Sequence, residues 1–278
     1  MKNIIQELRL HLDNSKSKDP ETLRVMAKEY LQSYALGFIY NHSRYKKLAF
    51  YGGTCAKIVY GLNRLSEDID LDNHAKIDLT HLGQDLQDLF TGKLQIDNTY
   101  VHTQGGELGI KRWTVRLPVL YQLKLSPLKN EKLHLKIEVS HHQQLANRIQ
   151  TPVNIHNQSF VATHYDLPSL MAGKMIACLE RVFKKSTTNI QVRGRDYYDL
   201  IWYMQQQIQP LEEKIKAESQ GELSVKAAFE KLDEKVKKLN KKDLAADLVA
   251  FFDNRVFIDT WLDNFQEFFQ RYAEFYLN

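Results

Sequence analysis

The chain has 278 residues and a mass of 32.5 kDa, and its 43% hydrophobic and 26% charged residues are ordinary for a globular protein with a large core. Its 38 Lys and Arg against 34 Asp and Glu give a net charge of +4, which permits an anionic partner without requiring one. No run approaches the roughly 18 to 20 apolar residues that cross a bilayer, and the first residues lack the apolar stretch of a secretory signal. These features exclude a peptide-sized scaffold and predict a cytoplasmic protein without a membrane segment.

The first clear element is a long helix with one buried face. Asp19 followed by Pro20 is typical of a helix N-terminus. Apolar residues then recur at three- and four-residue spacing as far as Ile39, which predicts a helix that packs against a core. We interpret this helix as scaffold.

A glycine pair follows the next predicted strand. Residues 47–51 predict a short buried strand, and residues 55–62 predict a helix. Between them, Gly52, Gly53 and Thr54 let the backbone approach a phosphate closely, with the N–H groups of the helix start facing its charge. The same pattern also occurs as simple punctuation between two elements, so the glycines alone do not decide the function.

Aspartates alternate with apolar residues from position 68 to position 72. A strand with this pattern turns Ile69 and Leu71 inward and its carboxylates outward. Asp68 and Asp70 then share one face, where two like charges repel each other unless a cation compensates them. Because carboxylate oxygens are good ligands for Mg²⁺, we predict that this pair holds Mg²⁺ beside a triphosphate bound at the glycines.

Two further strands are predicted after a helix near residues 82–90. They span residues 112–119 and 133–140, and each alternates apolar with polar side chains. In the second strand, Glu138 lies opposite the apolar face and is a candidate third carboxylate for a two-metal site. An exposed strand residue paired with Lys136 would give the same pattern, and the sequence leaves this alternative open.

The predicted elements change character near residue 165. Strands and helices mix before this point, whereas helices alone are predicted from Pro168 onward. We therefore expect an α/β (α+β) core with a mixed sheet over residues 1–165 and a helical domain over residues 166–278. Aromatic residues at helical spacing near the C-terminus predict core packing. The lysines of residues 230–242 are the best candidate for a basic patch, although a solvated helix face is the simpler interpretation.

Two groups of residues resemble the signature of the polymerase-beta-like nucleotidyltransferase superfamily. They are Gly52-Gly53-Thr54 and the run Arg-Leu-Ser-Glu-Asp-Ile-Asp-Leu at 64–71. Their form is similar to that of the AbiEii/AbiGii nucleotidyltransferases, the toxins of type IV toxin–antitoxin pairs. Two later blocks, Gly-Lys-Met-Ile-Ala at 173–177 with Arg181, and Arg-Asp-Tyr-Tyr-Asp-Leu at 195–200, resemble that family's later motifs and follow in its order.

The resemblance implies contacts to the nucleotide beyond the acidic strand. By this resemblance, Lys174 contacts the triphosphate, and a compact ammonium group suits that contact. Thr54 takes the position that contacts the terminal phosphates. Arg64 and Arg181 become phosphate or substrate clamps, although each has a neighbouring glutamate with which it could form a salt bridge instead.

The resemblance also implies a role for the second acidic block. Asp196 acts with the metal pair or positions the attacking group, whereas Asp199 has a weaker claim, because it could instead cap a turn or pair with Arg195. The implied catalytic residues are Asp68, Asp70, Glu138, Lys174 and Asp196; the nucleotide-binding residues are Gly52, Gly53, Thr54, Lys174 and Arg181; and the metal ligands are Asp68, Asp70 and Glu138.

The function implied by the resemblance is Mg²⁺-dependent transfer of a nucleoside monophosphate from an NTP to an acceptor. A polymerase-beta-like core would be followed by a helical domain that contributes Lys174 and Asp196 to the site. The expected acceptor is RNA, in particular the 3′ end of tRNA. The expected setting is a type IV toxin–antitoxin or abortive-infection system with a cognate antitoxin. Two alternatives stay open: nucleotidylation of a protein hydroxyl, and an NTP-binding switch module without catalysis.

Overall fold

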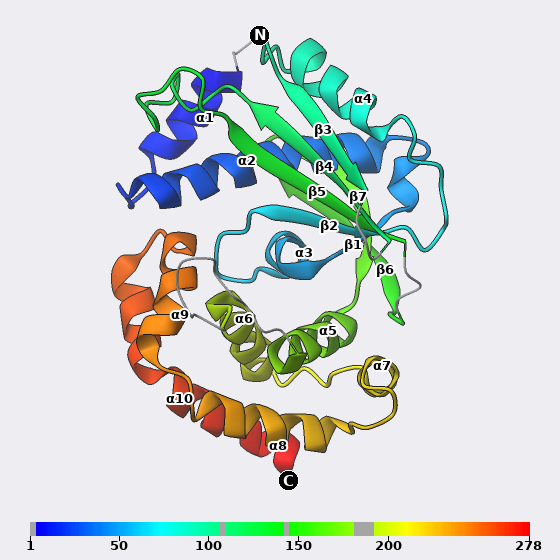
Figure 1. Cartoon of the computed structure of the whole chain (residues 1–278), viewed down its shortest axis with the longest axis vertical. Coiled ribbons are helices and arrows are strands. Elements are labelled where there is room, and N and C mark those ends of the chain that lie inside the picture. The colour runs from blue at the N-terminus through cyan, green and yellow to red at the C-terminus, as the bar shows by residue number, and fades with distance from the viewer. Residues whose placement is uncertain (1–3, 106–108, 142–144, 181–191) are drawn as a thin grey trace. The chain divides into compact units, whose positions relative to one another are not determined.

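The computed structural model describes residues 4–105, 109–141, 145–180 and 192–278 (Figure 1). The chain divides into two compact units. The first comprises Met1–Gln144 and Arg148–His164, and the second comprises Leu145–Asn147 and Tyr165–Asn278. We call them the sheet unit and the helical unit and describe each by itself.

The sheet unit is built on one mixed sheet. Within the described residues it has seven strands in the order β3-β4-β5-β2-β1-β7-β6. The strands are β1 (Ala49–Tyr51), β2 (Asp68–Asp72), β3 (Tyr100–Gly105), β4 (Ile110–Leu117), β5 (Leu133–Ser140), β6 (Arg148–Ile155) and β7 (Gln158–Tyr165). Strand β2 pairs in parallel with β5 and antiparallel with β1, while β1 pairs in parallel with β7. The mixed α/β fold predicted from the sequence is confirmed.

Helices in the sheet unit precede or connect these strands. They are α1 (Ile4–Asp13), α2 (Pro20–Asn41), α3 (Gly52–Tyr60) and α4 (Leu82–Asp88). Helix α2 begins where the sequence predicts, because a side-chain oxygen of Asp19 accepts a hydrogen bond from the backbone N–H of Thr22 at 2.8 Å. Helix α3 begins at Gly52, three residues earlier than predicted, so the glycine pair forms its first turn. Strand β1 is shorter than predicted, because Tyr45–Lys47 form a 3₁₀ turn.

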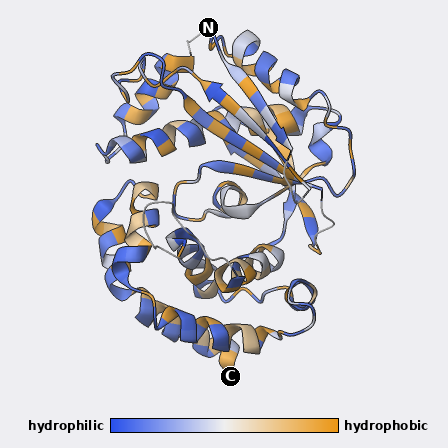
Figure 2. Cartoon of the chain, in the orientation of Figure 1, coloured by the Kyte–Doolittle hydropathy of each residue, from blue (hydrophilic) through white to orange (hydrophobic). Residues whose placement is uncertain are grey.

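The two faces of the sheet differ in polarity. Ile69, Ile137 and Trp113 lie side by side on β2, β5 and β4, and all three are buried. Helix α4 packs on this apolar face, where a Cβ added to Gly83 would lie 3.1 Å from the indole of Trp113. The opposite face carries the polar residues of the same strands, and Figure 2 shows the resulting alternation along β4 and β5.

The helical unit holds the remaining helices. They are α5 (Leu167–Glu180), α6 (Gly194–Gln205), α7 (Glu212–Glu218), α8 (Val225–Val236), α9 (Lys241–Leu248) and α10 (Arg255–Leu277). Trp261, Phe265 and Phe269 of α10 are buried, so the predicted aromatic core packing is confirmed for them. Helices α6 and α9 touch at Gly194, where any Cβ would collide with the backbone of Leu244.

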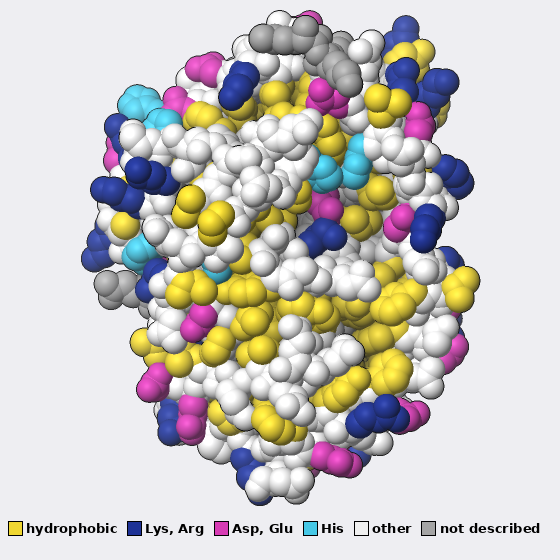
Figure 3. Space-filling model, turned by 180° about the vertical axis from the view of Figure 1, so that it is seen from behind, with side chains coloured by type: hydrophobic (Ala, Val, Ile, Leu, Met, Phe, Trp, Pro, Cys, Tyr) yellow, Lys and Arg dark blue, Asp and Glu magenta, His cyan; other side chains and the backbone are white. Residues whose placement is uncertain are grey.

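Three further features concern the surface, the cysteines and the apolarity of the helices. Figure 3 shows hydrophobic side chains gathered on the surface of the helical unit, among scattered charges. Cys55 and Cys178 are free and buried, as expected for small apolar side chains. Within the described ranges, no helix combines the length and apolarity that crossing a membrane would need.

Candidate functional site

The acidic strand β2 lies in the middle of the sheet, with its two predicted metal ligands on the polar face. Asp68 and Asp70 are two residues apart and therefore share this face. The strand register places Glu138 of β5 directly beside Asp70, and Lys136 beside Asp68. The register thus places the three carboxylates that the sequence singled out at nearby positions on one face of the sheet.

Each end of this carboxylate group lies next to a cation from the neighbouring strand. Arg112 Nε lies 2.6 Å from Glu138 Oε1, and Lys136 Nζ lies 3.9 Å from Asp68 Oδ1. Glu138 therefore pairs with Arg112 rather than with Lys136, the partner considered from the sequence. In the part of the chain that the structure describes, no three His, Cys, Asp or Glu residues are already clustered for a metal ion.

The glycine pair lies against the acidic strand. Gly52 has a φ of 77°, which disfavours any residue with a Cβ, and a Cβ there would collide with Oδ2 of Asp70. A Cβ on Gly53 would collide with Nη2 of Arg64. The two glycines therefore allow a carboxylate and a guanidinium group to approach the first turn of α3.

The start of α3 is fastened to the start of β2 by Thr54. Its side chain is fully buried, and its hydroxyl bonds the hydroxyl of Ser66 at 2.6 Å and donates to the backbone oxygen of Asp68. The hydroxyl thus lies inside the protein and positions β2. The first turn of α3 has no side-chain cap from Tyr51, so its backbone N–H groups carry the partial positive charge of a helix start.

The loop between α3 and β2 is held by buried charges that the sequence analysis missed or paired differently. Arg64 is buried and donates to the backbone oxygen of Leu65 at 2.8 Å. Glu67 pairs with Lys28 of α2 at 3.0 Å. Glu29, also on α2, accepts the backbone N–H of Ser66 at 3.2 Å, and burial raises its pKa. No sequence signal distinguished Glu29 from the other polar residues of its helix.

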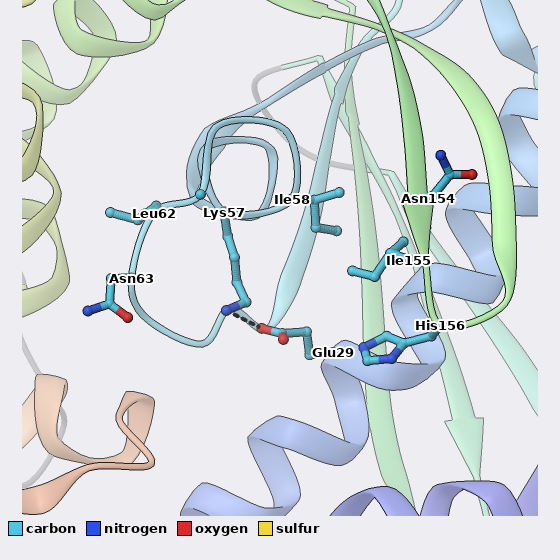
Figure 4. Close-up of a pocket in the computed structure, with 9 residues that line it drawn as sticks. Glu29, Lys57, Ile58, Leu62, Asn63, Asn154, Ile155 and His156 are labelled. Carbon is cyan, nitrogen blue, oxygen red and sulfur yellow. Dashed lines mark ion pairs between the residues drawn. The ribbon is translucent and has the colours of Figure 1, made fainter.

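A cavity of about 390 Å³ lies beside α3, between the end of this helix, α2 and β6 (Figure 4). The Glu29 carboxylate and the Lys57 ammonium group point toward each other on its wall, 3.6 Å apart. Ile58 and Ile155 form an apolar side, and His156 lies at its edge. Burial lowers the pKa of His156 to about 4, with smaller contributions from His11 and Lys57, so its imidazole is neutral at pH 7.

The helical unit contains the other predicted site residues. Lys174 of α5 donates to Asp196 Oδ1 at 2.7 Å, and its ammonium group lies 2.9 Å from Asp199 Oδ2. Both aspartates lie on one face of α6, three residues apart. The three side chains are only 15%, 4% and 1% exposed, so one ammonium group faces two buried carboxylates.

Neighbouring charges in the helical unit also have partners. Arg195 pairs with Asp247 at 3.3 Å, a partner that the sequence did not suggest, and its guanidinium group lies 4.0 Å from the centre of the Phe251 ring. Arg181 lies outside the described residues.

The predicted basic patch of residues 230–242 is partly used within the helical unit. Lys235 donates to the backbone oxygens of Cys178 and Leu179 at 2.6 and 3.1 Å, at the C-terminal end of α5. Lys237 pairs with Asp233, and Lys241 with Asp263. These three lysines therefore already have carboxylate or carbonyl partners within the protein. Fewer lysines of residues 230–242 are left to bind an anionic partner than the sequence alone suggests.

A mixed sheet with an acidic central strand against a glycine helix start is the arrangement expected of a nucleotidyltransferase. A sequence model of the family described as "Nucleotidyl transferase AbiEii toxin, Type IV TA system" matches residues 39–277. The chain therefore belongs to this family of toxin nucleotidyltransferases, as the motif resemblance predicted.

Solved structures with a similar fold come from Helicobacter pylori. JHP933 superposes with a TM-score of 0.50 at 18% identity, covering 91% of each chain. A second structure, of a candidate nucleotidyltransferase from H. pylori, gives a TM-score of 0.49 at 18% identity, covering 90% of this chain and 92% of that one. The likeness to JHP933 supports a shared fold. A comparison with curated proteins found no match.

Proposed function

We propose that this enzyme uses Mg²⁺ to transfer a nucleoside monophosphate from an NTP to RNA, with the 3′ end of tRNA as acceptor. The observation that carries the proposal is the contact between the glycine pair and the acidic strand. Asp70 lies so close to Gly52 that no Cβ fits between them. Phosphates bound at the start of α3 would therefore lie beside the carboxylates of β2.

The carboxylates of the sheet unit have the chemistry that a hard divalent cation requires. Asp68 and Asp70 would hold the ion, and Glu138, the neighbour of Asp70, would join them by exchanging its contact with Arg112. Bound Mg²⁺ supplies positive charge across the phosphates and lowers the pKa of the acceptor hydroxyl. The pair of oxygen ligands on one strand face supports this assignment.

The remaining residues would bind and orient the reactants. The backbone N–H groups of Gly53 and Thr54 would bind the terminal phosphates, and Lys174 would add a positive charge. The acceptor oxygen attacks the α-phosphorus, the bond to pyrophosphate breaks, and Glu138 or Asp196 takes the hydroxyl proton. In this proposal the helical unit contributes Lys174 and Asp196 to the reaction.

Membership in the family also supports a proposal about the biological setting, in which the chain is the toxin of a toxin–antitoxin pair. The chain would arrest growth when expressed alone, and a cognate antitoxin would neutralise it. Asp70→Ala should abolish the arrest if it depends on nucleotidyl transfer. Continued arrest by this variant, at equal protein level, would separate toxicity from the acidic strand.

The decisive experiment follows the α-phosphate. Each of the four α-labelled NTPs is incubated with the enzyme, Mg²⁺, total RNA and total protein, and label in each fraction is counted. Wild type is compared with Asp68→Ala/Asp70→Ala and with Asp88→Ala/Asp97→Ala, which removes the same charge from exposed positions of the sheet unit. We expect label in RNA, reduced at least about 10³-fold by the first variant and unchanged by the control.

Three other results would overturn the proposal. Label in protein, lost with Asp68 and Asp70, would assign protein nucleotidylation. Mg²⁺-dependent NTP binding without label in either fraction would assign a switch module. Unchanged RNA labelling by the Asp68→Ala/Asp70→Ala variant, with its fold intact by circular dichroism, would remove the acidic strand from the mechanism.

A further inference from the structure

The polar face of the sheet continues beyond the acidic strand onto β5, β4 and β3. The register aligns side chains in rows across these strands. Asp68 of β2 is followed by Lys136 of β5, Thr114 of β4 and His102 of β3. We call this surface the basic face and define it by Tyr100, His102, Arg112, Arg116, His134 and Lys136.

Residues of the basic face are open to solvent. The side chains of Arg112 and Lys136 are each 44% exposed, and Tyr100, at the sheet edge, is 51% exposed. Arg116 lies beside Tyr100 in the register, and its buried Nε has no hydrogen-bond partner within the described residues. An exposed aromatic ring thus stands next to the cationic side chain of Arg116.

The electrostatic environment of the basic face is positive. Burial lowers the pKa of His134, and the charges of Arg116, Lys28, Lys136 and Lys132 lower it further. Two residues of the basic face have acidic partners, Arg112 with Glu138 and Lys136 with Asp68, and both carboxylates belong to the acidic site. Away from the carboxylates of the site, the basic face therefore attracts anions.

We propose that the basic face is the docking surface for the single-stranded end of the RNA acceptor. The proposal rests on the proposed function and names the surface that presents the acceptor to the acidic strand. Phosphates would meet Arg116 and Lys136, and a base would stack on Tyr100. Cations beside an exposed aromatic ring on an open sheet form the usual combination for binding single strands.

The dimensions of the surface suit this occupant. Strands in a sheet lie about 4.8 Å apart, so the three steps from β2 to β3 span about 14 Å. This length accommodates a short strand rather than one nucleotide. The rows end on Asp68 and Asp70, so a strand that lies across the basic face would bring its terminal hydroxyl to the carboxylates.

The test measures RNA binding apart from catalysis. The probe is a fluorescein-labelled, ten-nucleotide single-stranded RNA of mixed sequence, titrated with the full chain at several salt concentrations. The variant is Tyr100→Ala/Arg116→Gln, which leaves the carboxylates and their cations in place. We expect about tenfold weaker binding, and a slope of log K against log salt that is smaller by about 0.7 for the lost phosphate contact.

The matched control is Tyr121→Ala/Lys111→Gln. Lys111 lies on the same strand as Arg116 but on the opposite face, and Tyr121 is an exposed tyrosine outside the strands, so one tyrosine and one positive charge are lost elsewhere. The control should bind RNA as wild type does, and both variants should bind Mg²⁺–NTP normally. Tyr100→Ala alone changes only an exposed position and keeps the test valid if the double variant misfolds.

Failure of this inference differs from failure of the proposed function. If wild type labels RNA but the variant and the control bind RNA equally, the basic face is not the acceptor surface and the function stands. If wild type labels protein and does not bind the RNA probe, both proposals are overturned. Equal losses in variant and control would show a general charge effect and would also overturn the docking surface.

Discussion

The sheet unit and the helical unit each combine acidic residues with lysine or arginine, but in opposite environments. In the sheet unit, Asp68 and Glu138 lie on an open face, and the cations beside them are 44% exposed. In the helical unit, Asp196 and Asp199 are almost completely buried around Lys174. Asp68 and Glu138 are themselves 24% and 22% exposed. Because their cationic partners are open to solvent, these two carboxylates can exchange a cationic side chain for a metal ion at lower cost than a fully buried pair could, since exposed ion pairs contribute about 0–1 kcal/mol.

Buried charges behave differently. Two carboxylates in the interior require their ammonium partner, because removing one member of a buried ion pair leaves an uncompensated charge. The Lys174 cluster therefore holds α5 and α6 together in addition to any role in the reaction. Similar residue types thus form exchangeable ion pairs in one unit and a fixed connection in the other.

The largest expected difference comes from removing one lysine in each unit. Lys174→Met should lower the free energy of unfolding by about 3–5 kcal/mol, because two buried aspartates lose their cation. Lys136→Met, next to Asp68, should lower it by about 1 kcal/mol or less. Urea unfolding of both variants measures the contrast, and equal losses would contradict it.

A smaller effect should follow from the glycine at the helix start. Gly52→Ala introduces a Cβ at a positive φ and against Asp70, so we expect a loss of stability above about 1 kcal/mol and a large loss of transferase activity. Gly61→Ala is the matched control, because Gly61 has a φ of 79° but open space around it. Both variants carry the backbone strain, and only Gly52→Ala displaces the carboxylate. Equal activity in the two would mean that the contact with Asp70 is unimportant.

The smallest expected effect is a loss of stability at acidic pH, and it should be confined to the sheet unit. All ten histidines precede residue 165, so the helical unit has none. The pKa of His156 is about 4 in the folded state, against 6.5 when unperturbed. The unfolded chain therefore binds a proton between these values that the folded chain does not, and stability falls as pH drops from 6.5 toward 4.

Hydrogen exchange at pH 7 and pH 5 can locate this acid effect. Protection should decrease in the β6–β7 hairpin, and His156→Asn should reduce the decrease, because asparagine tolerates the φ of 44° at this position. Helices α5 and α6 serve as the internal reference. A decrease of equal size in both units would show that His156 is not the source.

Local patterns predicted the centre of the sheet unit correctly. Alternation identified β2 and β5, and the glycines marked the start of α3, because each signal lies within a few consecutive residues. Strands β3 and β6 were missed, since their exposed residues break the alternation of polar and apolar side chains. Hairpin and edge strands with little buried surface give weak signals of this kind. Strand β7 was missed although Phe160, Ala162 and His164 are buried along it.

Pairings between side chains that are distant in the chain could not be predicted from the sequence. The partner of Glu138 depends on how β4 aligns with β5, and nothing local distinguishes Arg112 from Lys136 as its neighbour. The double contact of Lys174 depends in the same way on the packing of α5 against α6. The family resemblance named Lys174 and Asp196, and their roles in the reaction stay predictions until the variants are measured.

The contact between Gly52 and Asp70 also bears on the order of folding. Strand β1, helix α3 and strand β2 follow one another directly, and Tyr51 pairs with Asp70 after a single helical excursion. By contrast, β1 meets β7 through Phe50 and His164, far apart in the chain. Short loops close faster than long ones, so we expect the β1–α3–β2 unit to assemble early, while later segments are still being synthesised. On a nascent chain, the glycine turn and the acidic strand would then be in place before Lys174 is synthesised.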